Sequence, residues 1–266
     1  NASVKCWGRS RYGQLGLDST VTKGDNAGEM ASLSTVNLGT GRTATAIAAG
    51  YYHSCALLDN ASVKCWGYNA NGQLGIGSTT TMGTSSGEMA SLSTVNLGTG
   101  RTATAIAAGA NHTCALLDNG DVKCWGRNQY GQLGIDSTTN IGDSSGEMAS
   151  LSAVNLGTGR TATAIAAGGY HTCAILDNAS VKCWGRNSFG QLGIESTTQT
   201  GDSSGEMASL SAVNLGTGRT ANAISAGNYH TCAILDNASV KCWGYNYQGQ
   251  LGLENTTPMG DNTGEM

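Results

Sequence analysis

Pairs of cysteines ten residues apart are the residues of this sequence best suited to chemistry. In one copy, the stretch HTCAILDNASVKCWGRNSFGQLG runs from His171 to Gly193 and holds Cys173 and Cys183. The same spacing recurs in three further pairs: Cys55 with Cys65, Cys114 with Cys124, and Cys232 with Cys242. Two such thiols can form a disulfide, can pack as small apolar groups, or can bind zinc together with the nearby His171.

A disulfide fits this spacing best. An antiparallel hairpin with a three-residue loop at 177–179, centred on Asn178, would place Cys173 directly opposite Cys183, at a separation that a disulfide can bridge. Zinc fits less well, because three ligands on one flat sheet face leave its tetrahedron open. We therefore predict four disulfides, and with them an oxidising extracellular or cell-surface location.

Cys6 is the ninth cysteine and has no partner at this spacing. Its mate would lie about ten residues upstream, before Asn1. The sequence also begins inside a motif that is complete elsewhere in the chain. Both features predict that these residues are a fragment of a longer chain.

Triplets of the type Asn-X-Ser/Thr are acceptors for N-glycosylation in secreted proteins. They begin at Asn1, Asn60, Asn111, Asn178, Asn237 and Asn255. Those at Asn60, Asn178 and Asn237 occupy the tips of the predicted hairpins. Asparagine is also a common turn residue, so a purely structural role is the alternative. We predict glycosylation if the source is a eukaryote, with less access at Asn111, which begins a strand.

The elements that position these residues come in a repeat of 59 residues. The tripeptide Cys-Trp-Gly recurs at that interval, at Cys6, Cys65, Cys124, Cys183 and Cys242. Cutting at the shared Gly-Glu-Met gives the back half of a truncated repeat and four full repeats: 1–30, 31–89, 90–148, 149–207 and 208–266. Such self-similarity is typical of a repeat array, so we expect one continuous repeat domain.

Within a repeat, short strands alternate with turn signals. In the third full repeat we predict strands at 161–167, 172–176, 181–185 and 190–194, and one helical turn around 148–151. Four strands in about 59 residues is the size of one propeller blade. The fold class that we predict is therefore all-β, with tandem four-stranded propeller-type blades.

Both faces of the predicted sheet are mostly apolar. Side chains alternate along a strand, which places His171, Cys173 and Val181 on one face and Ala174 and Trp184 on the other. A sheet with two apolar faces must be covered on both sides, and stacking similar blades face to face achieves this without further elements.

The strings HTCAILD, VKCWGRN and GQLG, preceded by ATAIAAG, resemble repeats of the regulator of chromosome condensation family. The resemblance covers the whole chain and implies one blade per repeat. The best-known members form closed propellers of about seven blades, which need more than the 266 residues present here. The blades thus belong to part of such a ring or form an open superhelix. The resemblance decides little about function, because the family includes a GTPase exchange factor, ubiquitin ligases, a light receptor and secreted proteins.

Composition argues against several functions. The net charge of -4 and the absence of any run of Lys or Arg argue against nucleic acid as a partner. No 18-residue apolar stretch is available for membrane insertion. The four histidines, one per repeat, are His53, His112, His171 and His230. One residue type repeated at a fixed interval does not assemble a catalytic centre, so we expect hydrogen bonds within the sheet core, no enzymatic activity and no cofactor.

Two further polar positions recur in the repeats. Glu147 and Arg160, with their copies, are predicted to form an ion pair between adjoining loops. Asp143 and its copies Asp25, Asp202 and Asp261 offer carboxylates for Ca²⁺ as an alternative role, although Thr84 takes this place in one repeat.

The residues that follow Trp-Gly differ between copies and are rich in arginine and aromatic side chains. They are Arg9, Tyr12, Tyr68, Arg127, Tyr130, Arg186, Phe189, Tyr245 and Tyr247. Drift in exposed turns is one explanation of this variation. The alternative is a candidate interaction edge for protein or carbohydrate, because these residue types anchor interfaces and the loops repeat along one edge.

Three hypotheses for function follow. The first is a non-enzymatic extracellular structural protein, a rigid scaffold in a fibre or cell-surface appendage, whose partners are neighbouring copies or segments of the same protein. The alternative is a propeller-type binding module, lectin-like or protein-binding, for glycans or other extracellular proteins. A remote third is a small-GTPase exchange factor, which the paired cysteines disfavour.

Overall fold

The computed structural model describes residues 2–266 and shows four three-stranded antiparallel sheets, which repeat along the chain. The strands of the first two sheets are β1 (Ala44–Ala49), β2 (His53–Leu58), β3 (Val63–Gly67), β4 (Ala103–Ala108), β5 (His112–Leu117) and β6 (Val122–Gly126). Those of the last two are β7 (Ala162–Ala167), β8 (His171–Leu176), β9 (Val181–Gly185), β10 (Ala221–Ala226), β11 (His230–Leu235) and β12 (Val240–Gly244). Each sheet is one blade, and the predicted fold of tandem β blades is confirmed.

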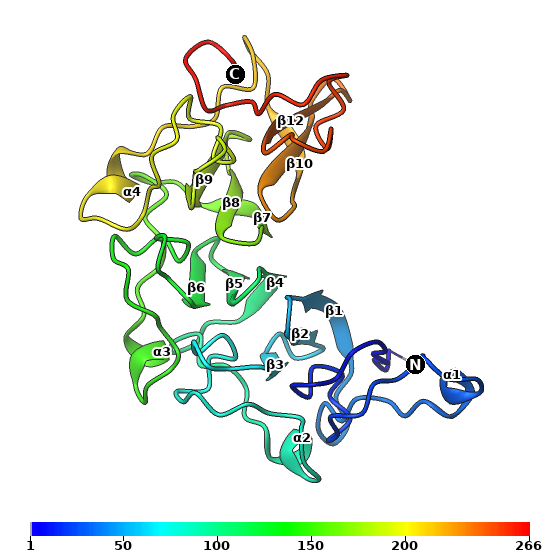
Figure 1. The fold of residues 1–266 in the computed structure, drawn as a ribbon. Helices are drawn as coiled ribbons and strands as arrows, with labels where there is room; N and C mark the ends of the chain where they lie inside the picture. Colours follow the sequence, from blue (N-terminus) through cyan, green and yellow to red (C-terminus); the bar gives the residue numbers. More distant parts are fainter. Residues whose placement is uncertain (1) are drawn as a thin grey trace.

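The blades follow an open arc (Figure 1). The first strands of successive blades, β1, β4, β7 and β10, contact one another and lie on the concave side. One helical turn per repeat lies on the outer side, at α1 (Glu29–Ser32), α2 (Glu88–Ser91), α3 (Glu147–Ser150) and α4 (Glu206–Ser209). The predicted helical turn is thus present. The repeat boundaries that we drew at Gly-Glu-Met stay a prediction.

The predicted fourth strand at 190–194 is wrong. Gly190 and Gly193 have φ of 74° and 66°, left-handed values that an extended strand does not adopt. The Gly193 amide donates a hydrogen bond of 2.8 Å to the Gly190 carbonyl, which closes a turn. The blade is instead completed by an isolated antiparallel bridge between Gly185 and Thr200, and each blade has the equivalent bridge.

The hairpin between the second and third strand of each blade has the predicted three-residue loop. In β8 and β9, the Leu176 amide donates to the Ser180 carbonyl at 2.8 Å. Ala179 takes a left-handed φ of 61°, and Gly120 holds the equivalent place in the β5–β6 hairpin. A left-handed third residue is the usual geometry of such loops. This register places Cys173 opposite Cys183.

Both faces of each inner blade are buried against a neighbouring blade, as predicted. Cys114, Leu116 and Val122 of one blade pack with Leu176 and Trp184 of the next. The tryptophans that follow each paired cysteine, Trp66, Trp125, Trp184 and Trp243, are 0% exposed. The core is therefore a series of similar interfaces between blades rather than one central cluster.

A hydrogen-bond chain crosses each of these interfaces. His112 Nε2 lies 3.0 Å from Thr172 Oγ1 in the next blade. The Thr172 hydroxyl donates at 2.9 Å to the Gln132 carbonyl, so its single proton is used and His112 must donate through Nε2. Trp184 Nε1 donates at 3.2 Å to the same carbonyl. The predicted hydrogen bond within the sheet is wrong, because the histidine bonds to the neighbouring blade.

The chain repeats at His53 with Thr113 and at His171 with Thr231. The Nδ1 atoms of His53, His112 and His171 are buried without a hydrogen-bond partner. Burial lowers the pKa of His53 to about 4 and those of His112 and His171 to about 3, because the charged imidazolium would lose its hydration. These three rings are therefore neutral at physiological pH.

The predicted ion pair between Glu147 and Arg160 does not form. Arg160 instead pairs with Asp177 at 3.2 Å, and every copy of this arginine pairs with the copy of this aspartate. The Glu147 carboxylate accepts the backbone amides of Gly142 at 2.8 Å and Ser144 at 2.9 Å. The glutamate thus closes the loop before its own helical turn.

A second carboxylate joins one repeat to the next at the outer side. Asp136 accepts the amides of Gly205 and Met207, both at 2.9 Å, at the start of α4. It does so from a left-handed backbone with φ of 54°. Asp18 caps α2 in the same way, whereas Gly77 takes this repeat position before α3 and has no carboxylate to offer.

We expect Asp136→Ala to lower the free energy of unfolding by about 1 to 3 kcal/mol, because the backbone amides of Gly205 and Met207 lose a charged acceptor. Glu254→Ala is the matched control: Glu254 has the same repeat position and a φ of 55°, and no described helix follows it. Gly77→Asp should add the missing cap and stabilise the chain by up to about 1 kcal/mol. Urea unfolding midpoints test this, and equal losses for Asp136→Ala and Glu254→Ala would contradict the cap.

Candidate interaction face

The structure brings the predicted interaction edge together with a second set of loops. The variable residues lie in the loops that follow β3, β6, β9 and β12, and in the equivalent loop near the start of the chain. Beside them run the short loops that join the first and second strand of each blade, at 50–52, 109–111, 168–170 and 227–229. All nine tyrosines and the single phenylalanine of the chain lie in these two sets of loops.

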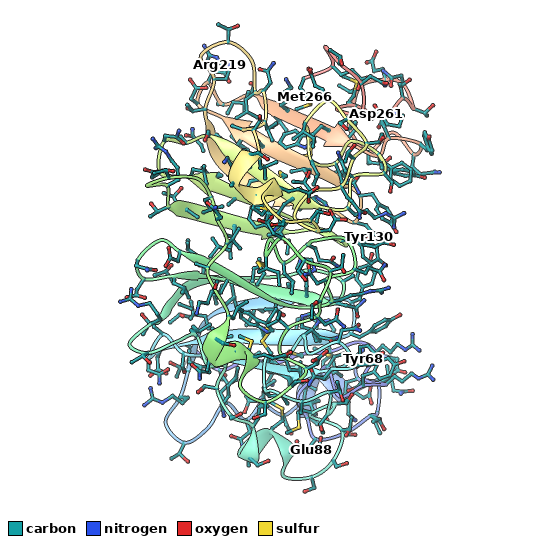
Figure 2. All side chains as sticks on the ribbon, turned by 90° about the vertical axis from the view of Figure 1, so that its left-hand side faces the viewer. Tyr68, Glu88, Tyr130, Arg219, Asp261 and Met266 are labelled. Atoms are coloured by element: carbon teal, nitrogen blue, oxygen red, sulfur yellow. A yellow bond between two sulfur atoms is a disulfide. The ribbon has the colours of Figure 1, made fainter. Side chains whose placement is uncertain are left out.

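We call this surface the aromatic face. Its aromatic residues are Tyr12, Tyr51, Tyr52, Tyr68, Tyr130, Tyr170, Phe189, Tyr229, Tyr245 and Tyr247, and its arginines are Arg9, Arg11, Arg127 and Arg186. Figure 2 shows Tyr68 and Tyr130 on one side of the stacked blades and Arg219 on the opposite side. The other four arginines of the chain, Arg42, Arg101, Arg160 and Arg219, belong to the Arg–Asp pairs.

Buried amide side chains hold the variable loops in place. Asn128 donates to the Ser137 carbonyl at 2.6 Å and accepts the Leu133 amide at 2.9 Å. Gln132 accepts the amide of Tyr130 at 2.9 Å. Gly131 has a φ of 73°, and a Cβ there would come within 2.3 Å of the Asp202 backbone. These contacts hold the loop backbone around Tyr130 in place, and the variable side chains are carried on this fixed backbone.

A first aromatic cluster lies on the N-terminal blades. The ring of Tyr12 lies 4.8 Å from that of Tyr68 and 5.3 Å from that of Tyr52, measured between centroids. Tyr51 packs edge-on against Tyr52 at 6.3 Å. The Arg11 guanidinium lies 5.5 Å from the centroid of Tyr12, within the range of a cation–π contact.

A second cluster lies on the C-terminal blades and is organised around Arg186. Its guanidinium carbon lies 5.1 Å from the ring of Tyr130, 5.2 Å from that of Tyr229 and 5.7 Å from that of Tyr170. Phe189 packs 4.8 Å from Tyr245. Three rings from three different loops thus contact one arginine. These contacts fix the direction of its guanidinium group.

The two clusters approach each other on the concave side of the arc. Burial and the neighbouring phenols of Tyr170 and Tyr229 raise the pKa of Tyr51. Tyr51, Gly109, Gly168 and Asn228 also line one shared depression of about 220 Å³. The aromatic face is therefore one continuous surface across the blades.

A cleft of about 480 Å³ opens in the second cluster. It is lined by Arg186, Phe189, Asn228, Tyr229, His230, Tyr245 and Gln250. Its volume falls within the range of ligand pockets, and it combines apolar walls with a few polar groups, as binding sites do.

Charge is distributed unevenly on this side of the molecule. The four-residue segments after each Trp-Gly (9–12, 68–71, 127–130, 186–189 and 245–248) and the short loops beside them hold four arginines and no Asp or Glu. The whole chain, by contrast, has a net charge of -4. Aspartates lie directly beside these loops, because the backbones of Asp143, Asp202 and Asp261 abut Gly72, Gly131 and Gly190. We call these three neighbouring aspartates the acidic border of the aromatic face.

The predicted disulfides are present in the structure. Cys55–Cys65, Cys114–Cys124, Cys173–Cys183 and Cys232–Cys242 are bonded, with Cα atoms 4.0 to 4.1 Å apart. The zinc and free-thiol alternatives are therefore wrong for these pairs. Cys6 is the free cysteine among residues 2–266, and burial raises its pKa. No group of His, Cys, Asp or Glu in that part of the chain is arranged to hold a metal ion.

The glycosylation candidates differ in accessibility. Asn60, Asn178 and Asn237 are exposed at hairpin tips, and each Oδ1 accepts the hydroxyl of the serine two residues later at 2.7 Å. Asn255 is exposed and Asn111 is half-buried, whereas Asn1 lies outside the described residues. Occupancy of these sites stays a prediction.

Sequence reasoning missed five of the fourteen residues of the aromatic face. Arg11 and the four tyrosines at the first-to-second strand loops, Tyr51, Tyr52, Tyr170 and Tyr229, were not among the predicted edge residues. A signal was available, because the residue before each histidine varies between copies as the predicted edge does: Tyr52, Asn111, Tyr170 and Tyr229.

Stacked antiparallel blades around an arc, with the variable residues in loops on one side, define a propeller-type repeat domain. The chain belongs to the RCC1-like domain family, whose family model matches residues 1–263. The predicted family resemblance is thereby confirmed.

Among known proteins, the chain is similar to the probable E3 ubiquitin-protein ligase HERC4 of Homo sapiens, with 31% identity over 79% of this chain and 18% of that protein. It is 27% identical to the ultraviolet-B receptor UVR8 of Arabidopsis thaliana over 95% of this chain and 51% of the receptor. The chain therefore spans about half or less of these relatives.

Two solved structures share the fold. Human WBSCR16 matches with a TM-score of 0.73 and 21% identity, over 95% of this chain and 59% of that one. Yeast RCC1 (Prp20), bound to Kap60, matches with a TM-score of 0.58 and 17% identity, over 96% of this chain and 69% of that one. Within residues 2–266, no helix has the length and apolar character that crossing a membrane requires.

Proposed function

We propose that this chain is a non-catalytic binding module that recognises another protein through the aromatic face. The observation that carries the proposal is the placement of every tyrosine and the only phenylalanine of the chain in the loops of this face. A random distribution over the loops would scatter them over both sides of the blades. Tyrosine and arginine are the residue types most enriched at the energetic centres of interfaces.

The arrangement of the blades supports the same proposal. Rigid sheets and buried amide side chains hold the loops, so little conformational entropy is lost when a partner orders the aromatic side chains. Tyr51, Tyr247 and Arg11 are exposed, and the other aromatic residues of the face are half-buried. Half-buried rings supported by neighbours present a large contact area in one conformation.

The other predicted functions have less support. The extracellular scaffold stays a prediction: similar stacked blades would make a stiff element, but the relatives and the aromatic face favour the binding module, its alternative from the sequence. A lectin-like module would also use aromatic rings, and glycan binding is an outcome that the experiment below can reveal. The exchange factor stays the remote alternative, because it requires a reducing compartment that four disulfides do not suit.

An oxidising location is part of the proposal. Four intrachain disulfides form and persist in secreted or cell-surface proteins, and three candidate glycosylation sites lie exposed beside them. Expression through a secretory pathway should therefore yield chains whose mass falls after treatment with an N-glycosidase. Conversion of Asn119-Gly120-Asp121, the one hairpin tip without the triplet, to Asn-Ala-Ser should add one further site.

Photo-crosslinking tests the binding face. A photoreactive phenylalanine analogue replaces Tyr130 or Tyr247 on the aromatic face, and Asp177 on the opposite side in a control. We expect discrete cross-linked proteins, identified by mass spectrometry from the material in which the protein is made, for the first two positions and not for the control. Equal cross-linking from both sides, or cross-links to glycan alone, would contradict a protein-binding face.

A further inference from the structure

We propose that the aromatic face binds a short acidic segment of its partner, and that Arg127 and Arg186 recognise the carboxylates of that segment. The inference rests on the proposed function, since it names the chemistry of the partner that the face would hold. Charge, geometry and an available cleft coincide at Arg186.

The arginines of this chain fall into two groups. Arg42, Arg101, Arg160 and Arg219, on the opposite side, each have an aspartate within 3.4 Å. None of the ion pairs among residues 2–266 includes an arginine of the aromatic face. Four guanidinium groups without a carboxylate partner therefore share one surface of a chain whose net charge is negative.

Arg186 is held in place by neighbouring side chains. Its side chain lies between the rings of Tyr130, Tyr170 and Tyr229, and its Nε donates to Ser188 at 3.1 Å. These contacts use the face of the guanidinium group and its Nε donor. The two terminal nitrogens keep their donors for a carboxylate, which they can bind with two parallel hydrogen bonds. A guanidinium fixed by aromatic rings loses little entropy on binding.

A cleft lies beside Arg186. It has about 480 Å³ of space, and its lining includes the amides of Asn228 and Gln250 and the rings of Phe189 and Tyr245. An extended peptide needs both apolar contacts for its side chains and amide groups for its backbone. Arg127, half-buried in the preceding repeat, extends the positive charge beyond the cleft.

The acidic border decides between a short segment and a long polyanion. A nucleic acid strand that followed successive repeats would pass Asp143, Asp202 and Asp261, whose backbones abut the loops, and their carboxylates would repel its phosphates. A few carboxylates in a protein segment can be confined to the arginines of the face. The four arginines disfavour lysine-rich partners, because like charges repel.

The test uses the whole chain and a short fluorescein-labelled peptide of alternating Glu and Gly, with its Gln-Gly counterpart as the neutral probe. Fluorescence anisotropy at low ionic strength should show saturable binding of the acidic peptide only. Combined Arg127→Gln and Arg186→Gln should weaken this binding by about tenfold or more, because charge-assisted hydrogen bonds are lost.

The matched control is the combination Arg160→Gln with Arg219→Gln, which removes the same charge from the opposite side. Binding there should stay within about twofold of the original, because exposed charges at this distance are screened. Thermal unfolding of both variants confirms that each is folded before its binding is compared.

Three results would overturn the inference: equal loss in the two double variants, no binding of the acidic peptide, or tighter face-dependent binding of a single-stranded oligonucleotide of the same charge. Absence of peptide binding while protein cross-links persist at Tyr130 and Tyr247 would refute the acidic segment alone. Absence of both would refute the proposed function as well.

Discussion

Acidification from about pH 6.5 to about pH 4.5 should destabilise the folded chain by about 7 kcal/mol, with disulfides intact. His53, His112 and His171 have pKa values of about 4, 3 and 3, below the value of about 6.5 expected for an unfolded chain. In this pH window the histidines of the unfolded state bind protons, whereas those of the folded state stay neutral. The free energy of unfolding therefore decreases as the pH falls. Each histidine contributes about 2 to 3 kcal/mol at the lower limit.

The physical cause is the buried Nδ1 of each ring, which has no acceptor for the proton that it would gain. Urea unfolding midpoints at a series of pH values measure the effect. Carboxylates of the unfolded chain bind protons chiefly below about pH 4.3. The window therefore ends before Glu88 and Glu265, whose folded pKa values are lowered by backbone hydrogen bonds that outweigh burial, lose most of their contribution. The carboxylates therefore add little to the slope in this interval.

His112→Gln separates the histidine contribution from other effects. Glutamine can still donate a hydrogen bond to Thr172 but does not titrate, so the pH dependence should become about one-third shallower. His230→Gln is the control, because His230 is only half-buried and its pKa is lowered less completely by the surrounding blade. Stability that stays constant between pH 6.5 and 4.5 would be incompatible with neutral buried rings.

Reduction of the four disulfides should destabilise the chain by about 10 kcal/mol. Each bond closes a loop across a sequence separation of ten residues, which corresponds to about 2 to 3 kcal/mol in the chain-entropy estimate. The total is comparable to the whole stability of an ordinary domain. We therefore expect the fully reduced chain to lose its near-ultraviolet circular dichroism at physiological temperature.

The order of reduction should follow burial. Cys232 and Cys242 are partly exposed, whereas the other six paired cysteines are 0% exposed. A mild reductant should therefore cleave Cys232–Cys242 first, which alkylation and mass spectrometry can detect. Replacing Cys173 and Cys183 together by Ala should cost about 2 to 3 kcal/mol, and Cys6→Ala should change the stability much less. Simultaneous loss of all four bonds would disprove the protection by burial.

The sequence was sufficient to predict the blades and the disulfides within them. The turn at Asn178 sets the register, since a shift by one residue would separate Cys173 from Cys183 and move every side chain to the opposite face. The cysteine spacing agrees with this register, which places Cys173 opposite Cys183. These are local features, and local features can be read from a single chain.

The errors share one cause, which is that the relevant partner lies in another loop or blade. The glycines at 190 and 193 promote turns, and only the long-range bridge to Thr200 shows how the blade is completed. Arg160 bonds to Asp177 rather than Glu147 because the strands bring the former close. His112 bonds to a threonine 60 residues away, which no spacing rule within one repeat indicates.

The aromatic face illustrates the same limit for function. The variable positions after Trp-Gly were recognisable as an edge, but the loops at 50–52 and 168–170 join them through strand pairing within each blade. The Tyr68 amide donates to the Tyr52 carbonyl and the Arg186 amide to the Tyr170 carbonyl. The arrangement of Arg186 among three rings depends on residues from three loops. Residue type predicted the chemistry of the face, and the fold decided which residues share it.

The hydrogen-bond chain between blades has a consequence for the history of the gene. Each full repeat brings a histidine on one face and a hydroxyl residue with a tryptophan on the other. The hydroxyl residue is threonine in three repeats and Ser54 in the first. Any repeat can therefore follow any other without a mismatched junction. Unequal recombination between such similar coding segments would insert or delete whole repeats in frame and still encode a chain that folds. Copy number is then free to vary between lineages, while selection on individual aromatic loops distinguishes one repeat from its neighbours.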